Sequence, residues 1–423
     1  MTQTLQDWLR QLERRTPEAK IELGLERVAD VWSRLHSGAM PCPVISVAGT
    51  NGKGSVVAML EAIYRSAGLR TLAYSSPHLL HFSERIRING EPAEDARIAA
   101  ALALIESARG EVPLTYFEHV TLAALALAVE TRPDVLVLEV GLGGRLDAVN
   151  VVDADIAVIT SIGLDHTEWL GPTRLSIGRE KAGIARAGRP LIVGERRLPA
   201  GLEPVLRATG AQLVLAGRDF RWRQVTGGGL RLDWAGRVYR LPRPALGGAW
   251  QLGNAACAVM AVLALEKRLA VSPASLSEGL QQVLLPGRLQ RVVEQPAVWL
   301  DVAHNAASAR ALAGALGPVA DGAASTAVFS ALSDKDIRAI GRALNPCFSR
   351  WLVAGLEGDR ACPAVDLAAR LSGIPVVGAV ETLESVPAAL NQALQDSAPH
   401  DRIVVFGSFR TVAAAATVLN ERY

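Results

Sequence analysis

The stretch from Val44 to Leu60 constrains the fold of this chain more than any other. A five-residue apolar run precedes a glycine-rich segment and a helix-compatible apolar run, the order of a strand, a phosphate-binding loop and a helix. Glycines let main-chain amides approach an anion, the helix points its positive end at that anion, and Lys53 adds a charge. The stretch predicts a nucleoside triphosphate site formed by Gly49, Thr50, Asn51, Gly52, Lys53, Gly54 and Ser55.

The glycine-rich segment departs from the general phosphate-loop pattern at two positions. Val47 stands where that pattern has its first glycine, and Gly54 separates Lys53 from Ser55. This spacing is not typical of GTPases or helicases. The alternative, a plain glycine turn with a solvated lysine, is disfavoured by the strand and helix patterns on either side.

Length, charge and cysteine content exclude several classes of protein. The 423 residues are enough for two to three domains, and a net charge of +2 gives no reason to expect nucleic acid or a membrane as partner. The longest apolar runs, such as residues 120–129, are too short to span a bilayer. The cysteines form no CxxC pair, so we expect neither a zinc site nor a disulfide framework, and a reducing cytoplasm fits best: Cys42, Cys257, Cys347 and Cys362.

Strand and helix patterns alternate after the glycine-rich segment. We expect the first helix to end at Ala67-Gly68, and we expect a polar loop over residues 82–90. The remaining predictions are strands at 71–74, 134–140 and 156–160 and helices at 94–107 and 117–131. Such alternation predicts a mostly parallel sheet that binds ligands at the carboxyl ends of its strands.

The pattern changes in the second half of the chain. Residues 212–246 predict a small antiparallel meander, and a long apolar helix is expected from Gln251 to about Leu269. A proline-glycine break at 285–288 divides the chain into expected domains 1–285 and 286–423. The second domain is expected to hold strands at 298–301, 327–330, 350–354 and 402–406. The 48 residues before the glycine-rich segment are too few for a separate nucleotide-sugar-binding domain.

Polar side chains follow three of the expected strands of the first domain. Glu139 lies at the end of an expected buried strand, the position of the Walker-B-type carboxylate that holds Mg²⁺ opposite a phosphate loop in nucleotide-binding proteins. A surface carboxylate at the end of a strand would give the same sequence pattern. Ser76 and His166 end other strands, and each alone is more often a capping hydroxyl or a solvated histidine. Lys181, judged by spacing alone, is an ordinary surface lysine of a helix.

The segment from Gly49 to Ser55 resembles the ATP loop of the Mur-ligase superfamily, and within it that of the folylpolyglutamate synthase and dihydrofolate synthase family. The matching pieces run in the family's order from residue 21 to about 410. This resemblance implies an α/β fold: a mostly parallel sheet like the Mur-ligase central domain, followed by a smaller Rossmann-like domain.

The same resemblance implies a set of nucleotide and metal ligands. It implies two Mg²⁺ ions held by Ser76, Glu139 and His166. Because magnesium prefers oxygen ligands, only the resemblance gives a reason to expect the histidine among them. It also implies that Lys181 reacts with CO₂ to form a carbamate, a reaction that a desolvated lysine favours. Further ATP contacts are implied for Asn254, Arg288 and Asp301, although helix capping is the simpler explanation for Asn254 and for Asn305.

The resemblance also implies residues for the other substrates. His304 joins Lys53 and Lys181 in the implied catalytic set, and His304 and Ser408 lie in segments that receive glutamate. The implied substrate contacts, in addition to Ser408, are Leu23, Gly24, Leu25, Phe82, Arg85, Phe117, Glu118, His119, Asp147 and Ala148.

The implied reaction joins L-glutamate to dihydropteroate with ATP through an acyl phosphate, and then adds further glutamates to reduced folates. We expect a monomer that binds small molecules only, and a requirement for K⁺ stays open. We also expect closure of the second domain about a hinge near Pro286-Gly287 to exclude water. The alternatives are polyglutamate extension alone, a muramyl-type amino acid ligase, which the short leader disfavours, and a nucleotide-dependent switch protein.

Overall fold

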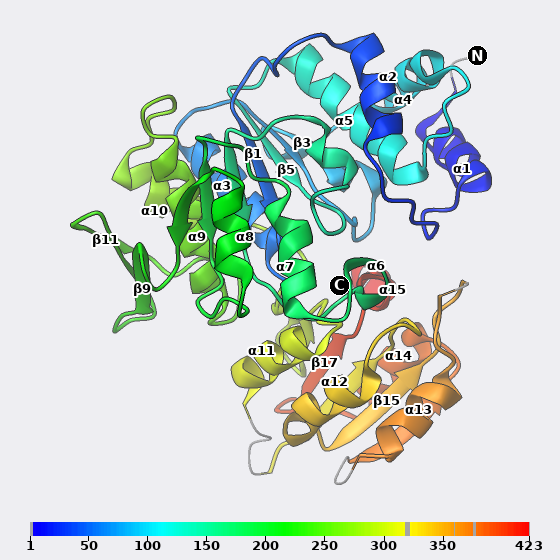
Figure 1. Cartoon of the computed structure of the whole chain (residues 1–423). Helices are drawn as coiled ribbons and strands as arrows, with labels where there is room; N and C mark the ends of the chain where they lie inside the picture. The colour runs from blue at the N-terminus through cyan, green and yellow to red at the C-terminus, as the bar shows by residue number, and fades with distance from the viewer. Residues whose placement is uncertain (1–2, 318–321, 359, 375–377, 423) are drawn as a thin grey trace. The chain divides into compact units, whose positions relative to one another are not determined.

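The computed structural model describes residues 3–317, 322–358, 360–374 and 378–422. The chain forms two compact units (Figure 1). The first unit comprises Met1–His78, Phe82–Ala245 and Gln251–Leu284, and the second comprises Leu79–His81, Leu246–Trp250 and Leu285–Tyr423. No helix in the described part of the chain is both long and apolar enough to cross a membrane.

The first unit is built on an eight-stranded sheet in the order β4-β3-β2-β5-β1-β6-β7-β8. The six strands from β2 to β8 in this order run parallel, whereas β3 and β4 are antiparallel. Val47 pairs with both Glu139 and Val158, so β1, β5 and β6 end at the same edge. The strands are β1 (Val44–Ala48), β2 (Thr71–Tyr74), β3 (Ile86–Ile88), β4 (Glu91–Pro92), β5 (Val135–Glu139), β6 (Ile156–Ile159), β7 (Pro190–Val193) and β8 (Gln212–Leu215).

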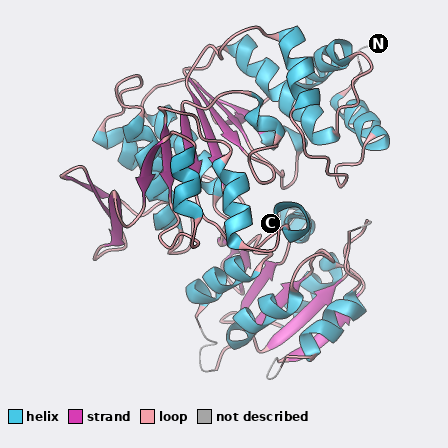
Figure 2. Ribbon diagram, viewed as in Figure 1, coloured by secondary structure: helices cyan, strands magenta, loops and turns pink. Residues whose placement is uncertain are grey.

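Helices cover both faces of this sheet (Figure 2). Strands β1, β2, β5 and β6 are buried along their whole length, as continuous apolar runs in a parallel sheet require. The helix α3 packs against β2, β5, α9 and α10, whereas α1 and α2 pack against α4. The helices are α1 (Leu5–Arg15), α2 (Glu26–Leu35), α3 (Lys53–Ser66), α4 (Asp95–Arg109), α5 (Tyr116–Thr131), α6 (Thr167–Leu170), α7 (Arg174–Ala182), α8 (Leu202–Ala208), α9 (Gln251–Ala264) and α10 (Pro273–Gln282).

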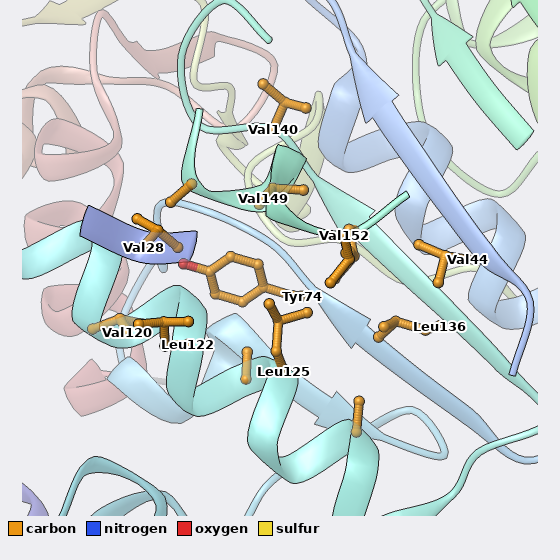
Figure 3. Packing of buried hydrophobic residues seen from close by; sticks show 14 of the residues in the cluster. Val28, Val44, Tyr74, Val120, Leu122, Leu125, Leu136, Val140, Val149 and Val152 are labelled. Atoms are coloured by element: carbon orange, nitrogen blue, oxygen red, sulfur yellow. The ribbon is translucent and has the colours of Figure 1, made fainter. Parts of the chain in front are cut away.

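Tyr74 lies in the middle of the core on one face of the sheet (Figure 3). Its ring is surrounded by aliphatic side chains from strands and helices, among them Val28, Leu125 and Leu136. Its hydroxyl lies 3.1 Å from Thr121 Oγ1, so the one polar atom of the ring has a partner in this core. Val28 belongs to α2, so the leader is part of the first unit's core.

Three expectations for the first unit are wrong in detail. The expected polar loop at 82–90 forms a 3₁₀ turn, η1 (Phe82–Arg85), and the antiparallel strand β3. The expected meander begins later, because β8 follows the crossover helix α8 and therefore joins the large sheet in parallel. The meander itself is β9 (Phe220–Gln224), β10 (Leu230–Trp234) and β11 (Arg237–Leu241). The helix α9 ends at Ala264 instead of near Leu269.

The second unit contains a six-stranded sheet in the order β12-β13-β17-β14-β15-β16, parallel except for β12. The expected strands correspond to β13, β14, β15 and β17, whereas the edge strands β12 and β16 carry polar residues and were not predicted. The elements are β12 (Gln290–Val293), β13 (Ala297–Leu300), α11 (Ala306–Leu316), β14 (Ser325–Phe329), α12 (Ile337–Leu344), β15 (Arg350–Ala354), α13 (Ala364–Ser372), β16 (Ala379–Leu383), α14 (Val386–Asp396), β17 (Arg402–Phe406) and α15 (Phe409–Arg422). The α/β fold class is confirmed.

Candidate functional site

The predicted phosphate loop connects β1 to α3 at the carboxyl edge of the first sheet. Main-chain N–H groups of Thr50 and Asn51 donate to the carbonyl and the hydroxyl of Ser161, at 2.9 and 3.0 Å. The Thr50 hydroxyl lies 3.1 Å from the Gly163 carbonyl and accepts the Gly163 N–H at 2.9 Å. Residues after β6 therefore hold the loop in shape, and the sequence analysis did not identify them. Their signal was the polar pair Thr160-Ser161 directly after a buried strand.

Lys53 is the first residue of α3, and its side chain turns back over the loop. Lys53 Nζ donates to the Gly49 carbonyl at 3.1 Å. Gly52 precedes the helix with φ of +91°, and within the described residues no side chain caps this helix. The N–H groups of the first helical turn remain oriented for an anion. The backbone and the lysine thus have the arrangement that phosphate binding requires.

Asn254 lies over the phosphate loop. A Cβ atom on Gly52 would overlap the Asn254 side-chain amide, so only glycine permits this close approach. Asn254 Nδ2 donates to Gln251 Oε1 at 2.8 Å, and Gln251 Nε2 donates to Ser55 Oγ at 3.3 Å. Asn254 lies within α9, so the interpretation of this residue as a helix cap is wrong.

Two residues of the predicted metal set lie side by side. Glu139 is the last residue of β5, is 5% exposed, and accepts the Ser76 main-chain N–H at 3.3 Å. A buried carboxylate and a neighbouring serine both offer oxygen ligands, which a hard divalent cation prefers. His166 directly precedes α6, with its Nε2 atom 4.0 Å from Asp165 Oδ1. The described residues contain no group of three or more His, Cys, Asp and Glu placed to hold a metal.

Lys181 is 3% exposed, so its interpretation as a surface lysine is wrong. Ile177 and Lys181 are one helical turn apart, and this face of α7 packs into the core. Burial lowers the pKa of Lys181 to about 7, and the charge of Lys53 acts in the same direction. The carboxylates of Asp165 and Asp147 oppose this shift. Lys181 therefore lies within electrostatic range of Lys53 and of two acidic groups.

Asp147 is buried in the loop that follows β5. Its carboxylate accepts the N–H groups of Leu142 and Val149 at 2.7 and 3.0 Å. Burial raises its pKa to about 6, while these hydrogen bonds and the charge of Lys53 oppose the rise. Ala148 begins the short turn η2 (Ala148–Val151) that Asp147 caps. The Asp147 carboxylate is thus fixed near the phosphate loop.

The leader and α5 contact the same loop. The Gly24 N–H donates to the Leu146 carbonyl at 3.3 Å, which places Leu23 and Leu25 beside residues 141–148. A Cβ on Gly141 would fall 2.5 Å from Cζ of Phe117, so the Phe117 ring lies against this loop as well. The structure therefore gathers this group of predicted substrate residues around residues 141–148.

The neighbouring predictions Glu118 and His119 lie in internal hydrogen-bond networks. Glu118 accepts Arg27 Nη2 at 2.7 Å and the N–H of Thr115 at 2.7 Å, and it completes the cap of α5. His119 is fully buried, with Nε2 3.1 Å from the Leu102 carbonyl and Nδ1 3.2 Å from Arg15 Nη2. Burial lowers the pKa of His119 to about 4. Contact of these two residues with a substrate stays a prediction.

Arg85 is 1% exposed and is surrounded by aromatic and polar groups. Its Nη2 donates to Glu18 Oε1 at 2.5 Å and its Nε to His78 Nδ1 at 2.8 Å. Its guanidinium carbon lies 5.4 Å from the ring centre of Phe82 and 5.9 Å from that of Tyr116. Glu18 and Tyr116 were not identified in the sequence, because no motif marks residues that meet only in the fold.

In the second unit, Asp301 follows β13 at the carboxyl edge of the sheet. It accepts the N–H groups of Leu289 and Ala303, both at 2.8 Å. Burial raises its pKa, and the charge of Arg288 opposes the rise. The Arg288 guanidinium carbon lies 5.1 Å from the ring centre of Phe409.

His304 and Ser408 lie after β13 and β17 of the same sheet. His304 Nδ1 lies 2.8 Å from the Val302 carbonyl oxygen, which can only accept a hydrogen bond, so this nitrogen carries a proton. Ser408 Oγ accepts the Thr411 N–H at 3.0 Å. Asn305 caps α11, which confirms the capping interpretation for this residue. The roles of His304 and Ser408 toward glutamate stay predictions.

Two family models match most of the chain. The Mur ligase middle domain matches residues 47–189, and the Mur ligase glutamate ligase domain matches residues 287–409. The first region contains the phosphate loop, Glu139 and Lys181, and the second contains Arg288, Asp301 and His304, whereas Asn254 lies between the two.

Curated relatives and solved structures extend this similarity to the whole chain. The chain is 42% identical to the dihydrofolate synthase/folylpolyglutamate synthase of Escherichia coli, over 99% of this chain and 96% of that protein. It is 34% identical to the protein of that name from Mycobacterium tuberculosis, over 96% and 92%. The structure of the E. coli FolC in complex with DHPP and ADP matches with a TM-score of 0.92 over 99% of this chain and 98% of that chain.

A further solved structure carries a metal and an amino acid. A bifunctional folylpolyglutamate synthase/dihydrofolate synthase with Mn, AMPPNP and L-glutamate bound is 43% identical, with a TM-score of 0.89 over 99% of this chain and 98% of that chain. Sequence, fold and the phosphate loop agree, and the chain belongs to the dihydrofolate synthase/folylpolyglutamate synthase family of Mur ligases.

Proposed function

We propose that this protein is an ATP-dependent ligase that joins L-glutamate to dihydropteroate to form dihydrofolate and adds further glutamates to reduced folates. The observation that carries the proposal is the loop from Gly49 to Ser55, with Lys53 folded over it and the uncapped first turn of α3 behind it. Membership of the family and the DHPP, ADP and L-glutamate named in the related structures support the choice of substrates.

The chemistry explains why a carboxylate–amine ligase needs such a loop. A carboxylate oxygen is a poor leaving group, so the γ-phosphoryl group of ATP is first transferred to the carboxylate of the pteridine acid. The amine of glutamate then attacks the carbonyl carbon of this acyl phosphate, and phosphate leaves. During phosphoryl transfer, Lys53 and the loop amides stabilise the negative charge on the transferred group.

Glu139 and Ser76 are the residues of the first unit best suited to hold Mg²⁺, with His166 as a third, proposed ligand. Such a cation would neutralise charge on the β- and γ-phosphates. A carbamate on Lys181 would place a negative group near Lys53, and the lowered pKa of this buried lysine supports its formation. We propose a monovalent cation such as K⁺ as a further ligand of the site.

The second unit supplies the remaining proposed contacts. Arg288 and Asp301 would bind the nucleotide, and His304 and Ser408 would receive glutamate. The buried Asp301, fixed by two main-chain N–H groups, supports a role in recognition because its position cannot vary. We further propose that the protein acts as a monomer in the cytoplasm, on small molecules alone.

Formation of ADP by the purified protein tests this proposal. Reactions contain Mg·ATP and L-glutamate with dihydropteroate, with tetrahydrofolate, or with neither. We expect ADP with either acceptor and almost none without an acceptor. Activity with tetrahydrofolate alone would reduce the function to polyglutamate extension, as in the relative from Lacticaseibacillus casei named folylpolyglutamate synthase. ADP formation that ignores both acceptors would overturn the proposal and favour a nucleotide-dependent switch.

A further inference from the structure

The three-stranded sheet β9–β11 contains no residue of the proposed site, yet its Trp222 contacts a helix of that site. A Cβ atom added to Gly253 would fall 3.0 Å from Trp222 Cζ2. Gly253 is the third residue of α9 and directly precedes Asn254. The missing side chain at residue 253 therefore lets the Trp222 ring approach the main chain of α9 in its first turn.

Trp222 is also fixed by Arg196. The Arg196 guanidinium carbon lies 3.9 Å from the centre of the Trp222 ring, and Arg196 Nη2 donates to the Trp222 carbonyl at 2.6 Å. One interaction orients the ring and the other holds the main chain of β9.

The segment that carries Arg196 is itself joined to the phosphate loop. Glu195 Oε2 accepts the Ile162 N–H at 3.1 Å, and Gly163 is hydrogen-bonded to Thr50. Trp222 thus contacts two segments that hold the phosphate loop. One is the turn after β7, which acts through Thr50, and the other is the first turn of α9.

We propose that Trp222 is a positioning residue of the nucleotide site: through Gly253 it fixes the first turn of α9 so that Asn254 stays over Gly52. The inference rests on the proposed function only in taking residues 49–55 as the nucleotide-binding loop. Trp222 acts through α9 and does not itself contact the nucleotide. A shift of this turn by a few tenths of an ångström would move the Asn254 amide away from Gly52.

The test uses the full-length protein and four variants: Gly253→Ala, Trp222→Leu, the double variant and Trp234→Leu. Calorimetry measures binding of Mg·ADP, a readout that does not depend on which acceptor the enzyme uses. Trp234 belongs to the same small sheet, and the three atoms nearest to a Cβ on Gly253 all belong to Trp222, so Trp234→Leu controls for general damage to that sheet. Circular dichroism confirms that each variant is folded.

The variants are expected to show coupling between residues 222 and 253. Gly253→Ala should weaken Mg·ADP binding about tenfold, because the methyl group displaces α9 against the ring. Adding Trp222→Leu makes room for the methyl group, so the double variant should bind no more than about twofold more weakly than Trp222→Leu alone. Trp234→Leu should bind as the wild type does.

Three results would overturn the inference. The first is that Gly253→Ala lowers the affinity for Mg·ADP by the same factor whether residue 222 is tryptophan or leucine. The second is unchanged Mg·ADP binding in both Gly253→Ala and Trp222→Leu. The third is a Trp234→Leu variant that binds Mg·ADP as weakly as Trp222→Leu does. If Gly253→Ala fails to fold, Trp222→Leu and Trp222→Phe decide the question. Trp222→Leu should weaken Mg·ADP binding, and Trp222→Phe should keep most of the wild-type affinity. Equal affinities of the two variants would contradict the proposal. Failure of the ligase assay together with intact coupling in ADP binding would remove the proposed reaction alone.

Discussion

Asn254 lies directly over Gly52, so close that a Cβ atom on Gly52 would overlap the asparagine amide. The contact joins the first turn of α9 to the loop that precedes α3, two segments about two hundred residues apart in the sequence. Gly52 also has φ of +91°, a conformation that side chains with a Cβ disfavour. Both properties require glycine at this position of the nucleotide site.

Gly52→Ala is expected to impair the use of ATP. A left-handed alanine costs about 1–2 kcal/mol, and the displaced Asn254 adds to this, so kcat/KM for ATP should fall about a hundredfold. Gly217→Ala is the matched control, because Gly217 has φ of +85° and nothing lies within 4 Å of its added Cβ. The control should lose stability but not activity. Equal kcat/KM for both variants would mean that the overlap with Asn254 is unimportant.

Glu139→Gln is expected to impair metal use. The amide keeps the size of the side chain, and its oxygen can still accept the Ser76 N–H. The lost negative charge should raise the Mg²⁺ concentration for half-maximal activity and lower kcat about a hundredfold. Glu130→Gln, which alters an exposed ion pair with Arg97, is the control and should leave the Mg²⁺ titration unchanged. An unaltered titration in Glu139→Gln would remove this residue from the metal site.

The sequence predicted the four central strands of the first sheet, β2, β5, β1 and β6, because these strands are continuous apolar runs. Such runs are buried on both faces of a parallel sheet. The phosphate loop also showed that a strand, β1, comes before it and a helix, α3, after it. The edge strands β12 and β16 were missed because half-exposed strands carry polar residues that resemble loops. The parallel placement of β8 depends on the preceding crossover helix, which a local alternation pattern cannot reveal.

The site was predictable where residues are neighbours in a motif and unpredictable where they meet through folding. Lys53 and Gly52 follow from the loop itself. The burial of Lys181 was missed because α7 is mixed in polarity and its helical period does not distinguish the inward face. The stacking of Trp222 on Arg196, and its contact with Gly253, join three distant segments that share no sequence signal.

Lys181 is expected to form a carbamate at neutral pH. Its pKa of about 7 leaves a neutral amine available above pH 7, whereas an exposed lysine is almost wholly protonated there. With ¹³C-bicarbonate, the NMR signal of a carbamate carbon should appear in wild type and vanish in Lys181→Met. Lys20→Met, which removes an exposed lysine, is the control and should keep the signal. The signal should rise as pH increases through 7, and its absence from wild type would exclude the modification.

His119 should make the stability of the first unit fall in mild acid. Burial holds its folded-state pKa at about 4, below the 6.5 of an unperturbed histidine, so between these values the unfolded state binds a proton that the folded state does not. The folded state should therefore lose about 3 kcal/mol of stability from this group as pH falls from 6.5 to 4. His119→Gln can still donate to the Leu102 carbonyl and accept from Arg15 but cannot titrate. Urea unfolding at several pH values should show a shallower acid loss in His119→Gln, and identical pH profiles would mean that His119 is protonated equally in both states.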